Sequence, residues 1–271
     1  MGEAHTDMTN PSEPASNILV TGPAESGYTV VEINRPERKD ALTRQTMIEL
    51  ADAIGDAGGN KDCHAIILTG SGGFCSGVDL DDLSKSPLNA RSGAEAYETP
   101  QKMIKELIRS PVPTIAAVDG PAIGMGMDLA LACDMRFVGP EGFFMQGWAR
   151  VSLIPATGGA LFLQRLAPGS LWQLVDEQRR VAADRLSELG LAEKALPSAR
   201  VAAVERAARF ASAPRSLLEG YVRLSRADVR NALDEHLHSA AETQFGLMSQ
   251  LGEYRTRAAE LKQGLGQRPG N

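Results

Sequence analysis

The sequence predicts an α/β fold that ends in a long helical region, and three observations support this. Two short, uninterrupted apolar runs at 65–69 (AIILT) and 114–118 (TIAAV) are typical of strands buried on both faces. Each run leads through a glycine-containing turn toward a helical pattern, which is the alternation of an α/β core. From Leu161 onward the apolar spacing is mostly helical, and it is almost entirely helical between Ala202 and Lys262.

The 271 residues divide into four predicted segments. Residues 1–16 are polar, contain Pro11 and Pro14, and are expected to form a disordered tail. We expect a core over 17–200, a helical region over 201–262 and a flexible tail over 263–271. A chain of this length can bury a sizeable core without metal or disulfide support.

The core is expected to open with a β-hairpin. Strands are predicted at 17–21 and 28–34, with the turn residues Gly22-Pro23 and Ser26-Gly27 between them. Thr43 is expected to cap a helix over 44–57, and further helices are predicted over 101–109 and 127–133. Strands are predicted at 65–69, 114–118 and 135–138, and a loop over 84–94. Of the later helices, one is expected to carry Trp172 as a core residue.

Charge and composition exclude several classes of function. The net charge of −6 argues against a broad nucleic-acid surface. No apolar run approaches the roughly 18 residues that span a bilayer, and the N-terminus lacks the pattern of a secretory signal. Cys63, Cys75 and Cys133 have neither metal-ligand nor redox spacing. We therefore expect free buried thiols, no metal site and a cytoplasmic protein without a membrane or nucleic-acid partner.

Two glycine-containing turns are candidate parts of an active site. One follows the strand at 65–69 and reaches Ser76; the other, Gly124-Met125-Gly126, opens a helix. Backbone N–H groups at such turns can point at a ligand, and two that converge form an oxyanion hole for a carbonyl oxygen. Leu129 stands where a dinucleotide fingerprint needs glycine, and the first turn lacks the Lys-Ser/Thr of a P-loop. The alternative is that both turns are only tight connections.

Three blocks resemble the enoyl-CoA hydratase/isomerase family, also called the crotonase superfamily. They read FCSGVDL (74–80), TIAAVDGPAIGMGMDLALACDMRF (114–137) and IPATGGALFLQRL (154–166), in the family's order and spacing. The resemblance implies a crotonase-like spiral of ββα units with a C-terminal helical trimerisation region. It also implies an acyl-CoA thioester as substrate, no cofactor beyond the coenzyme A of that substrate, and a homotrimer or a dimer of trimers.

The resemblance assigns roles to individual residues. It places the oxyanion hole at the backbone N–H groups of Ser76 and Met125. Lys262 could reach the coenzyme A of a neighbouring subunit, with a solvated amphipathic helix as the alternative. For Arg38 and Lys39, an exposed charged loop is the alternative to a role in binding. The other implied substrate contacts are Gly77, Val78, Asp79, Leu80 and Gly124, with Arg38 and Lys39 near the coenzyme A phosphates.

The sequence departs from the family at the acid–base positions. Asp128 stands where relatives carry their first catalytic glutamate; a helix-start hydrogen bond is the alternative to an acid–base role. Trp148 replaces the second glutamate, and an indole offers one N–H donor and no acid–base group. It could stack on an acyl group, or donate to a water or a carboxylate. Ala156 occupies the position of the acid in some isomerase-like relatives.

These departures argue against hydration by two carboxylates. One base and an oxyanion hole suffice for a proton shift between C2 and C4, so we expect a hydratase/isomerase-type enzyme with Asp128 as base and Trp148 shaping the acyl pocket. An acyl-CoA-binding protein with little turnover and another reaction of this fold, such as thioester hydrolysis, are the alternatives. A second acid could come from the nearby carboxylates Asp81, Asp82, Glu95 and Glu98.

Overall fold

The computed structural model describes residues 16–85 and 90–266. The predicted tail over 1–16 therefore lies almost wholly outside the described residues, as do residues 86–89 of the predicted loop. Within the described ranges, no helix has the length and apolar character needed to cross a membrane.

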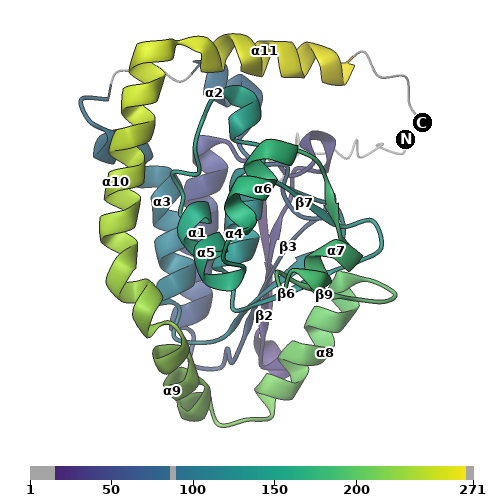
Figure 1. Cartoon of the computed structure of the whole chain (residues 1–271). Helices are drawn as coiled ribbons and strands as arrows, with labels where there is room; N and C mark the ends of the chain where they lie inside the picture. Colours follow the sequence, from purple (N-terminus) through teal and green to yellow (C-terminus); the bar gives the residue numbers. More distant parts are fainter. Residues whose placement is uncertain (1–15, 86–89, 267–271) are drawn as a thin grey trace, which may run out of the picture.

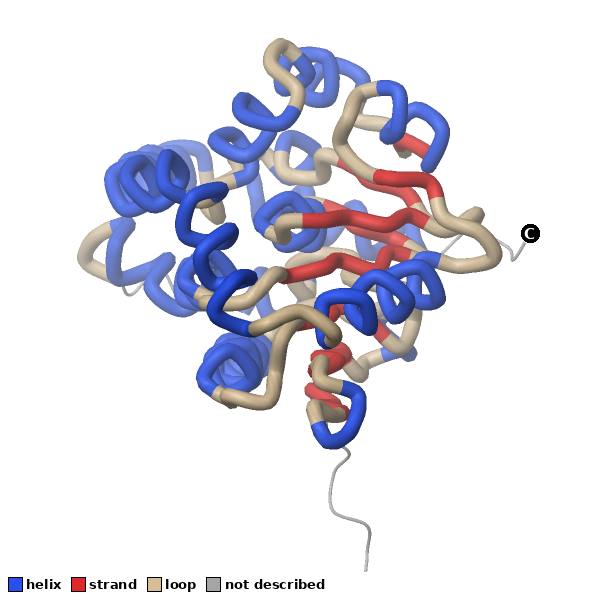
Figure 2. Tube along the Cα trace, turned by 90° about the horizontal axis from the view of Figure 1, so that it is seen from below, coloured by secondary structure: helices blue, strands red, loops and turns tan. Residues whose placement is uncertain are grey.

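A six-stranded sheet lies at the centre of the molecule (Figure 2), in the order β1-β2-β3-β4-β6-β9. The predicted hairpin is confirmed because β1 and β2 pair antiparallel. The other neighbouring strands pair parallel, as expected for strands joined through helices. The strands are β1 (Ile18–Thr21), β2 (Thr29–Ile33), β3 (Ile66–Gly70), β4 (Thr114–Val118), β6 (Met135–Val138) and β9 (Glu193–Lys194).

The sheet is buried on both faces, which is why its strands are uninterrupted apolar runs. Ile66 and Leu68 pack into one core with α1 (Arg44–Gly59), α3 (Gly93–Arg109) and α4 (Met125–Ala132). Ile67 belongs to a second core, on the opposite face, which contains Ala203 and Ala207 of α8 (Ala199–Ala211). Successive residues of one strand thus enter different cores, as strand geometry requires.

A second, three-stranded sheet holds the start of α4 in place. This sheet was not predicted from the sequence. Its order is β5-β7-β8. The amide of Gly124, directly after β5, donates to the carbonyl of Met145 in β7 at 3.0 Å. Because α4 starts at the next residue, this sheet fixes the start of α4 beside the segment that leads to Trp148. The elements are β5 (Pro121–Ile123), β7 (Phe143–Met145), β8 (Val181–Ala182), α5 (Gly159–Leu166), α6 (Ser170–Glu177) and α7 (Ala183–Glu188).

The predicted helical region consists of α8, α9 (Arg215–Ser225), α10 (Ala227–Leu251) and α11 (Glu253–Gly266). In Figure 1, α10 runs along α3 and α11 crosses above α2 (Leu80–Lys85). Tyr254 and Ala258 anchor α11, since they are 2% and 1% exposed. Helix α11 also covers 263–266, which were expected to belong to a flexible tail.

Some predictions from the local sequence are confirmed by the structure, and others are not. Thr43 caps α1 as predicted, accepting the Thr46 N–H on its side chain at 3.2 Å. Helix α3 starts at Gly93, inside the predicted loop, because Ser92 caps it and the helix continues through Pro100. Cys63, Cys75 and Cys133 are free and buried, as expected. Trp172 was expected in the core but is 76% exposed.

Candidate active site

The two predicted turns lie side by side. The Cys75 amide donates to the Pro121 carbonyl at 2.9 Å, and the Ile123 amide donates to the Cys75 carbonyl at 3.1 Å. Gly77 has φ +98°, and a Cβ there would lie 2.6 Å from the Ile123 carbonyl oxygen and 3.7 Å from the Met125 nitrogen. Glycine therefore permits this close approach. The Met125 amide belongs to the first turn of α4, where N–H groups have no intrahelical acceptor.

The geometry favours Val78 over Ser76 as the donor from the first turn. The Ser76 amide already donates to the Lys39 carbonyl at 3.0 Å, so a role in an oxyanion hole would require this bond to break. The Gly77 carbonyl accepts from the Leu42 amide at 2.8 Å. In a trans peptide the following N–H, that of Val78, points the opposite way. That direction is away from Leu42, and the preceding Gly77 is the residue that approaches the second turn.

Asp128 is the buried carboxyl of the site, with 3% of its surface exposed. Its Oδ2 accepts the indole N–H of Trp148 at 3.1 Å and the hydroxyl of Thr157 at 2.5 Å. The Gly159 amide donates to the same carboxylate. Burial raises the pKa of Asp128 to about 7, although all three hydrogen bonds act to lower it. A carboxyl with this pKa can take up and release a proton near neutral pH.

Thr157 and Gly159 were missed by the sequence prediction. Both lie in the third family-like block, IPATGGALFLQRL, but their contact with Asp128 joins residues about thirty positions apart. A Cβ on Gly159 would lie 2.0 Å from Asp128 Oδ1, so only glycine fits against the carboxylate. Asp128 is the fourth residue of α4, and its side-chain hydrogen-bond partners, Trp148 and Thr157, lie outside that helix.

Trp148 fills the position where the resemblance expects a second glutamate. It is 5% exposed, and its ring atoms lie 3.8–4.0 Å from the position of a Cβ on Gly124. Of the predicted options, the indole donates to a carboxylate, that of Asp128. Ala156 is fully buried and packs in a small cluster with Tyr97 and Ala241. Neither position offers a second acid or base.

Some of the residues expected near coenzyme A are buried and hold the local structure, and others are exposed at the surface. Asp79 pairs with Arg35 at 3.1 Å and accepts the Asp81 amide at 3.0 Å at the start of α2. Leu80 is the first residue of α2 and packs against the core. The side chain of Arg38 is 52% exposed and pairs with Asp81 at 3.4 Å. Lys262 pairs with the same aspartate of its own chain, so α11 brings a second cation to this edge.

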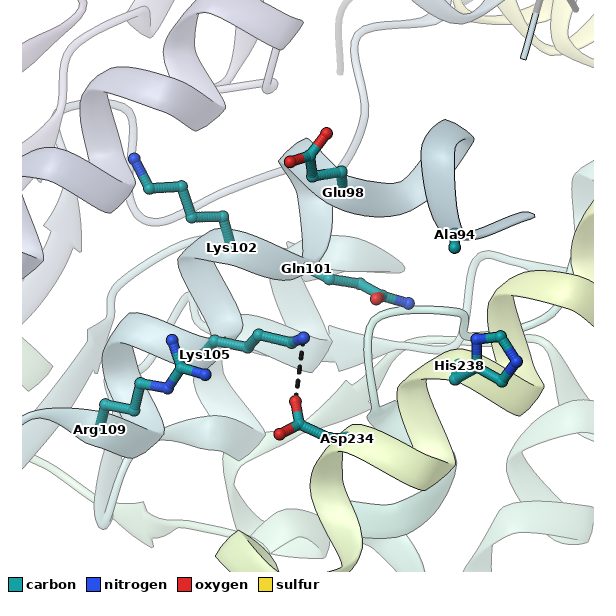
Figure 3. Close-up of a pocket in the computed structure, with 8 residues that line it drawn as sticks. All are labelled: Ala94, Glu98, Gln101, Lys102, Lys105, Arg109, Asp234 and His238. Atoms are coloured by element: carbon teal, nitrogen blue, oxygen red, sulfur yellow. Dashed lines mark ion pairs between the residues drawn. The ribbon is translucent and has the colours of Figure 1, made fainter. Parts of the chain in front are cut away.

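The nearby carboxylates make local contacts of their own. Asp82 accepts the Arg44 amide at 2.9 Å, and Glu95 accepts the Arg91 amide at 2.8 Å. Glu98 lines a groove of about 290 Å³ between α3 and α10 (Figure 3). In this groove Lys105 pairs with Asp234 at 2.9 Å. The geometry thus brings none of these acids into contact with Asp128 in the part of the chain described.

An apolar cavity of about 370 Å³ is lined by residues that lie near Trp148 and Gly159 in the sequence. Gln146 and Ala149, which flank Trp148 in sequence, line it on one side, and Pro155 and Ala160 line it on another. Pro155 also lies close to Gly159, since a Cβ on that glycine would be 3.1 Å from the Pro155 Cβ. The other apolar lining residues are Leu153, Ile154, Leu171, Trp172, Val175 and Ala240.

Comparisons with known proteins agree on one family. The family model for enoyl-CoA hydratase/isomerase matches residues 24–266. A "Probable enoyl-CoA hydratase" of Rhodobacter capsulatus is 33% identical over 236 residues, covering 84% of this chain and 89% of that protein. A "Probable enoyl-CoA hydratase" of Mycobacterium bovis is 42% identical over 125 residues, or 45% of this chain and 46% of that one. A putative enoyl-CoA hydratase/isomerase from Acinetobacter baumannii shares the fold, with a TM-score of 0.82 at 24% identity over 92% of this chain and 100% of that one. On these grounds the chain belongs to the enoyl-CoA hydratase/isomerase family.

Proposed function

We propose that this protein binds an acyl-CoA thioester and shifts a proton between C2 and C4 of its enoyl chain, with Asp128 as the single base. The thioester oxygen accepts the amides of Val78 and Met125, which stabilise the charge of the enolate. The reaction needs no cofactor beyond the coenzyme A of the substrate. The observation that carries the proposal is the 3.1 Å hydrogen bond from the buried indole of Trp148 to Asp128 Oδ2.

This hydrogen bond favours isomerisation over hydration. Hydration in this family requires a water molecule held between two acid–base groups. In this proposal the indole takes the place of the second group, and it donates a hydrogen bond without exchanging a proton in this chemistry. A proton shift needs one carboxylate that is alternately charged and neutral, and a pKa of about 7 suits Asp128 to that task.

The same proposal assigns the rest of the ligand. Arg38 and Lys262 meet at Asp81, and we place the coenzyme A phosphates at this cationic edge. The apolar cavity of about 370 Å³ receives the acyl chain. Support comes from its lining, which includes Gln146 and Ala149 near Trp148 in the sequence and Ala160 next to Gly159.

Assembly into a trimer is part of the proposal. Three large apolar side chains of α9 lie at helical spacing on one face: Leu217, Tyr221 and Leu224 are 51%, 66% and 76% exposed. An exposed apolar face of this kind supports a subunit interface.

The second candidate is an acyl-CoA-binding protein with little or no turnover. The same indole favours it, because Trp148 and Thr157 occupy both acceptor positions of Asp128 Oδ2. In this case the turns and the cavity bind the ligand, and the carboxyl serves only to hold α5.

One set of assays separates these functions. We expect the protein to convert 3-enoyl-CoA to 2-enoyl-CoA, to hydrate crotonyl-CoA far more slowly, and to bind acyl-CoA by calorimetry. Trp148→Glu supplies a second carboxylate, so hydration is expected to rise in this variant. Trp148→Phe has neither a carboxylate nor an indole N–H, so no gain in hydration is expected from it. Tight binding without turnover at any chain length would establish the binding protein instead.

A further inference from the structure

The loop that carries Thr157 is held from two helices by buried glutamines. Gln101 of α3 donates from Nε2 to the Ala156 carbonyl at 3.0 Å and to the Leu237 carbonyl of α10 at 2.8 Å. In Figure 3 its side chain extends from α3 toward α10. Gln244 of α10 accepts the Ile154 amide at 2.5 Å. Gln101 is 6% exposed and Gln244 is fully buried, so the backbone before Thr157 is fixed by contacts shielded from water.

The two side-chain hydrogen bonds of Asp128 are both on the same oxygen, Oδ2. A carboxylate offers about four lone-pair positions, two on each oxygen. Trp148 and Thr157 take both positions on Oδ2. Oδ1 lies close to Gly159, since a Cβ there would be 2.0 Å from this oxygen. No side-chain hydrogen bond to Oδ1 is found among the residues that the structure describes, so the acceptor positions left by Trp148 and Thr157 lie on this oxygen.

We propose that Thr157 is a positioning residue of this enzyme, which holds Asp128 Oδ2 together with Trp148 and thereby directs the transferred proton to Oδ1. The inference rests on the proposed function, in which Asp128 is the base. Oδ1 takes the proton from C2 of the 3-enoyl thioester while the C–H electron pair moves toward the enolate oxygen. The same proton then returns to C4, the double bond forms between C2 and C3, and the carboxylate is regenerated.

Two substitutions separate the hydroxyl of Thr157 from its volume. Thr157→Val keeps the shape of this fully buried side chain and removes the donor. Thr157→Ser keeps the donor and removes a methyl group. A residue that only fills space would be replaced better by valine, whereas a positioning residue is replaced better by serine.

The decisive measurement is the titration of Asp128 itself, by carbon NMR on protein labelled at its aspartate carboxyl groups. The signal is assigned by its absence in Asp128→Asn. In Thr157→Val we expect the pKa of Asp128 to rise by at least about 1, because the charged form loses a hydrogen bond. We expect kcat for 3-enoyl-CoA to fall roughly 10- to 100-fold with little change in KM, and Thr157→Ser to recover most of both values.

The outcomes separate this inference from the proposed function. If a folded Thr157→Val protein, judged by its Tm, shows the wild-type pKa at Asp128, the positioning role is overturned even when the wild type is active. If valine preserves kcat better than serine does, it is overturned as well. A wild-type protein without turnover removes the proposed reaction alone, and a raised pKa in Thr157→Val would then still support the hold of Thr157 on Asp128.

Discussion

The candidate site has a backbone half and a side-chain half, and the two are supported differently. The amides of Val78 and Met125 are placed by pairing between chain segments, such as the bonds from Cys75 to β5. Their own side chains take no part in this pairing, which joins main-chain groups. The carboxylate of Asp128 instead depends on the identity of Trp148, Thr157 and Gly159. The position of the two main-chain amides should therefore tolerate side-chain substitutions. A substitution at Trp148, Thr157 or Gly159, in contrast, should affect the carboxylate of Asp128.

The largest expected effect is on the side-chain half. Asp128→Asn keeps an oxygen for the Trp148 and Thr157 donors but cannot take up a proton, so turnover should fall by roughly 10³-fold. Acyl-CoA binding, measured by calorimetry, should remain nearly unchanged because the backbone amides of both turns, to which we assign the thioester oxygen, are intact. Asp52→Asn is the matched control, since this side chain is 57% exposed and pairs with Lys102 on the surface. Unchanged turnover in Asp128→Asn would remove the carboxyl from the mechanism.

Two glycine substitutions test the halves against each other. In Gly159→Ala the new methyl group would lie 2.0 Å from Asp128 Oδ1 and must displace the carboxylate, so turnover should fall by about 10². In Gly77→Ala the methyl group would lie 2.6 Å from the Ile123 carbonyl oxygen and push the two turns apart. We expect this second variant to lose acyl-CoA affinity, by roughly tenfold.

Calorimetry and kinetics on both variants decide whether the halves are independent. Gly246→Ala is the control, because a Cβ there meets no atom within 4 Å and the residue lies inside α10. It should be neutral or slightly stabilising. If Gly159→Ala and Gly77→Ala damage binding and turnover in the same ratio, the division into two halves is wrong.

The effect expected on stability, and not on turnover or binding, is its dependence on pH. Because the pKa of Asp128 is raised from 3.8 to about 7, the folded protein keeps a proton that the unfolded chain has lost. The folded state then binds more protons, so this contribution to stability is complete below about pH 4 and is lost as the pH rises through about 7. Relative to Asp128→Asn, the wild type should lose unfolding free energy across that window.

Chemical denaturation of both proteins at several pH values measures this difference. Turnover should show the opposite trend, rising through about pH 7 as the base becomes charged. Parallel stability curves for the wild type and Asp128→Asn would mean that the pKa of this carboxyl is not raised.

Local sequence signals predicted the main sheet well and the site only in part. The strand at 114–118 and the cap at Thr43 were correct, because uninterrupted apolar runs and capping hydroxyls act through near neighbours. The small sheet of β5, β7 and β8 has strands of two or three residues, too short to show a periodic pattern. Trp172 was misplaced because apolar spacing on α6 does not show which face meets the core.

By itself the sequence determined the fold class and the position of both turns. Those features are carried by residue type and spacing along the chain. Only the tertiary structure decided that the amide of Ser76 is already paired, that Lys262 reaches Asp81 of its own chain and that Thr157 holds Asp128. Each of these is a contact between distant segments, and its direction depends on how β-strands and helices pack in three dimensions.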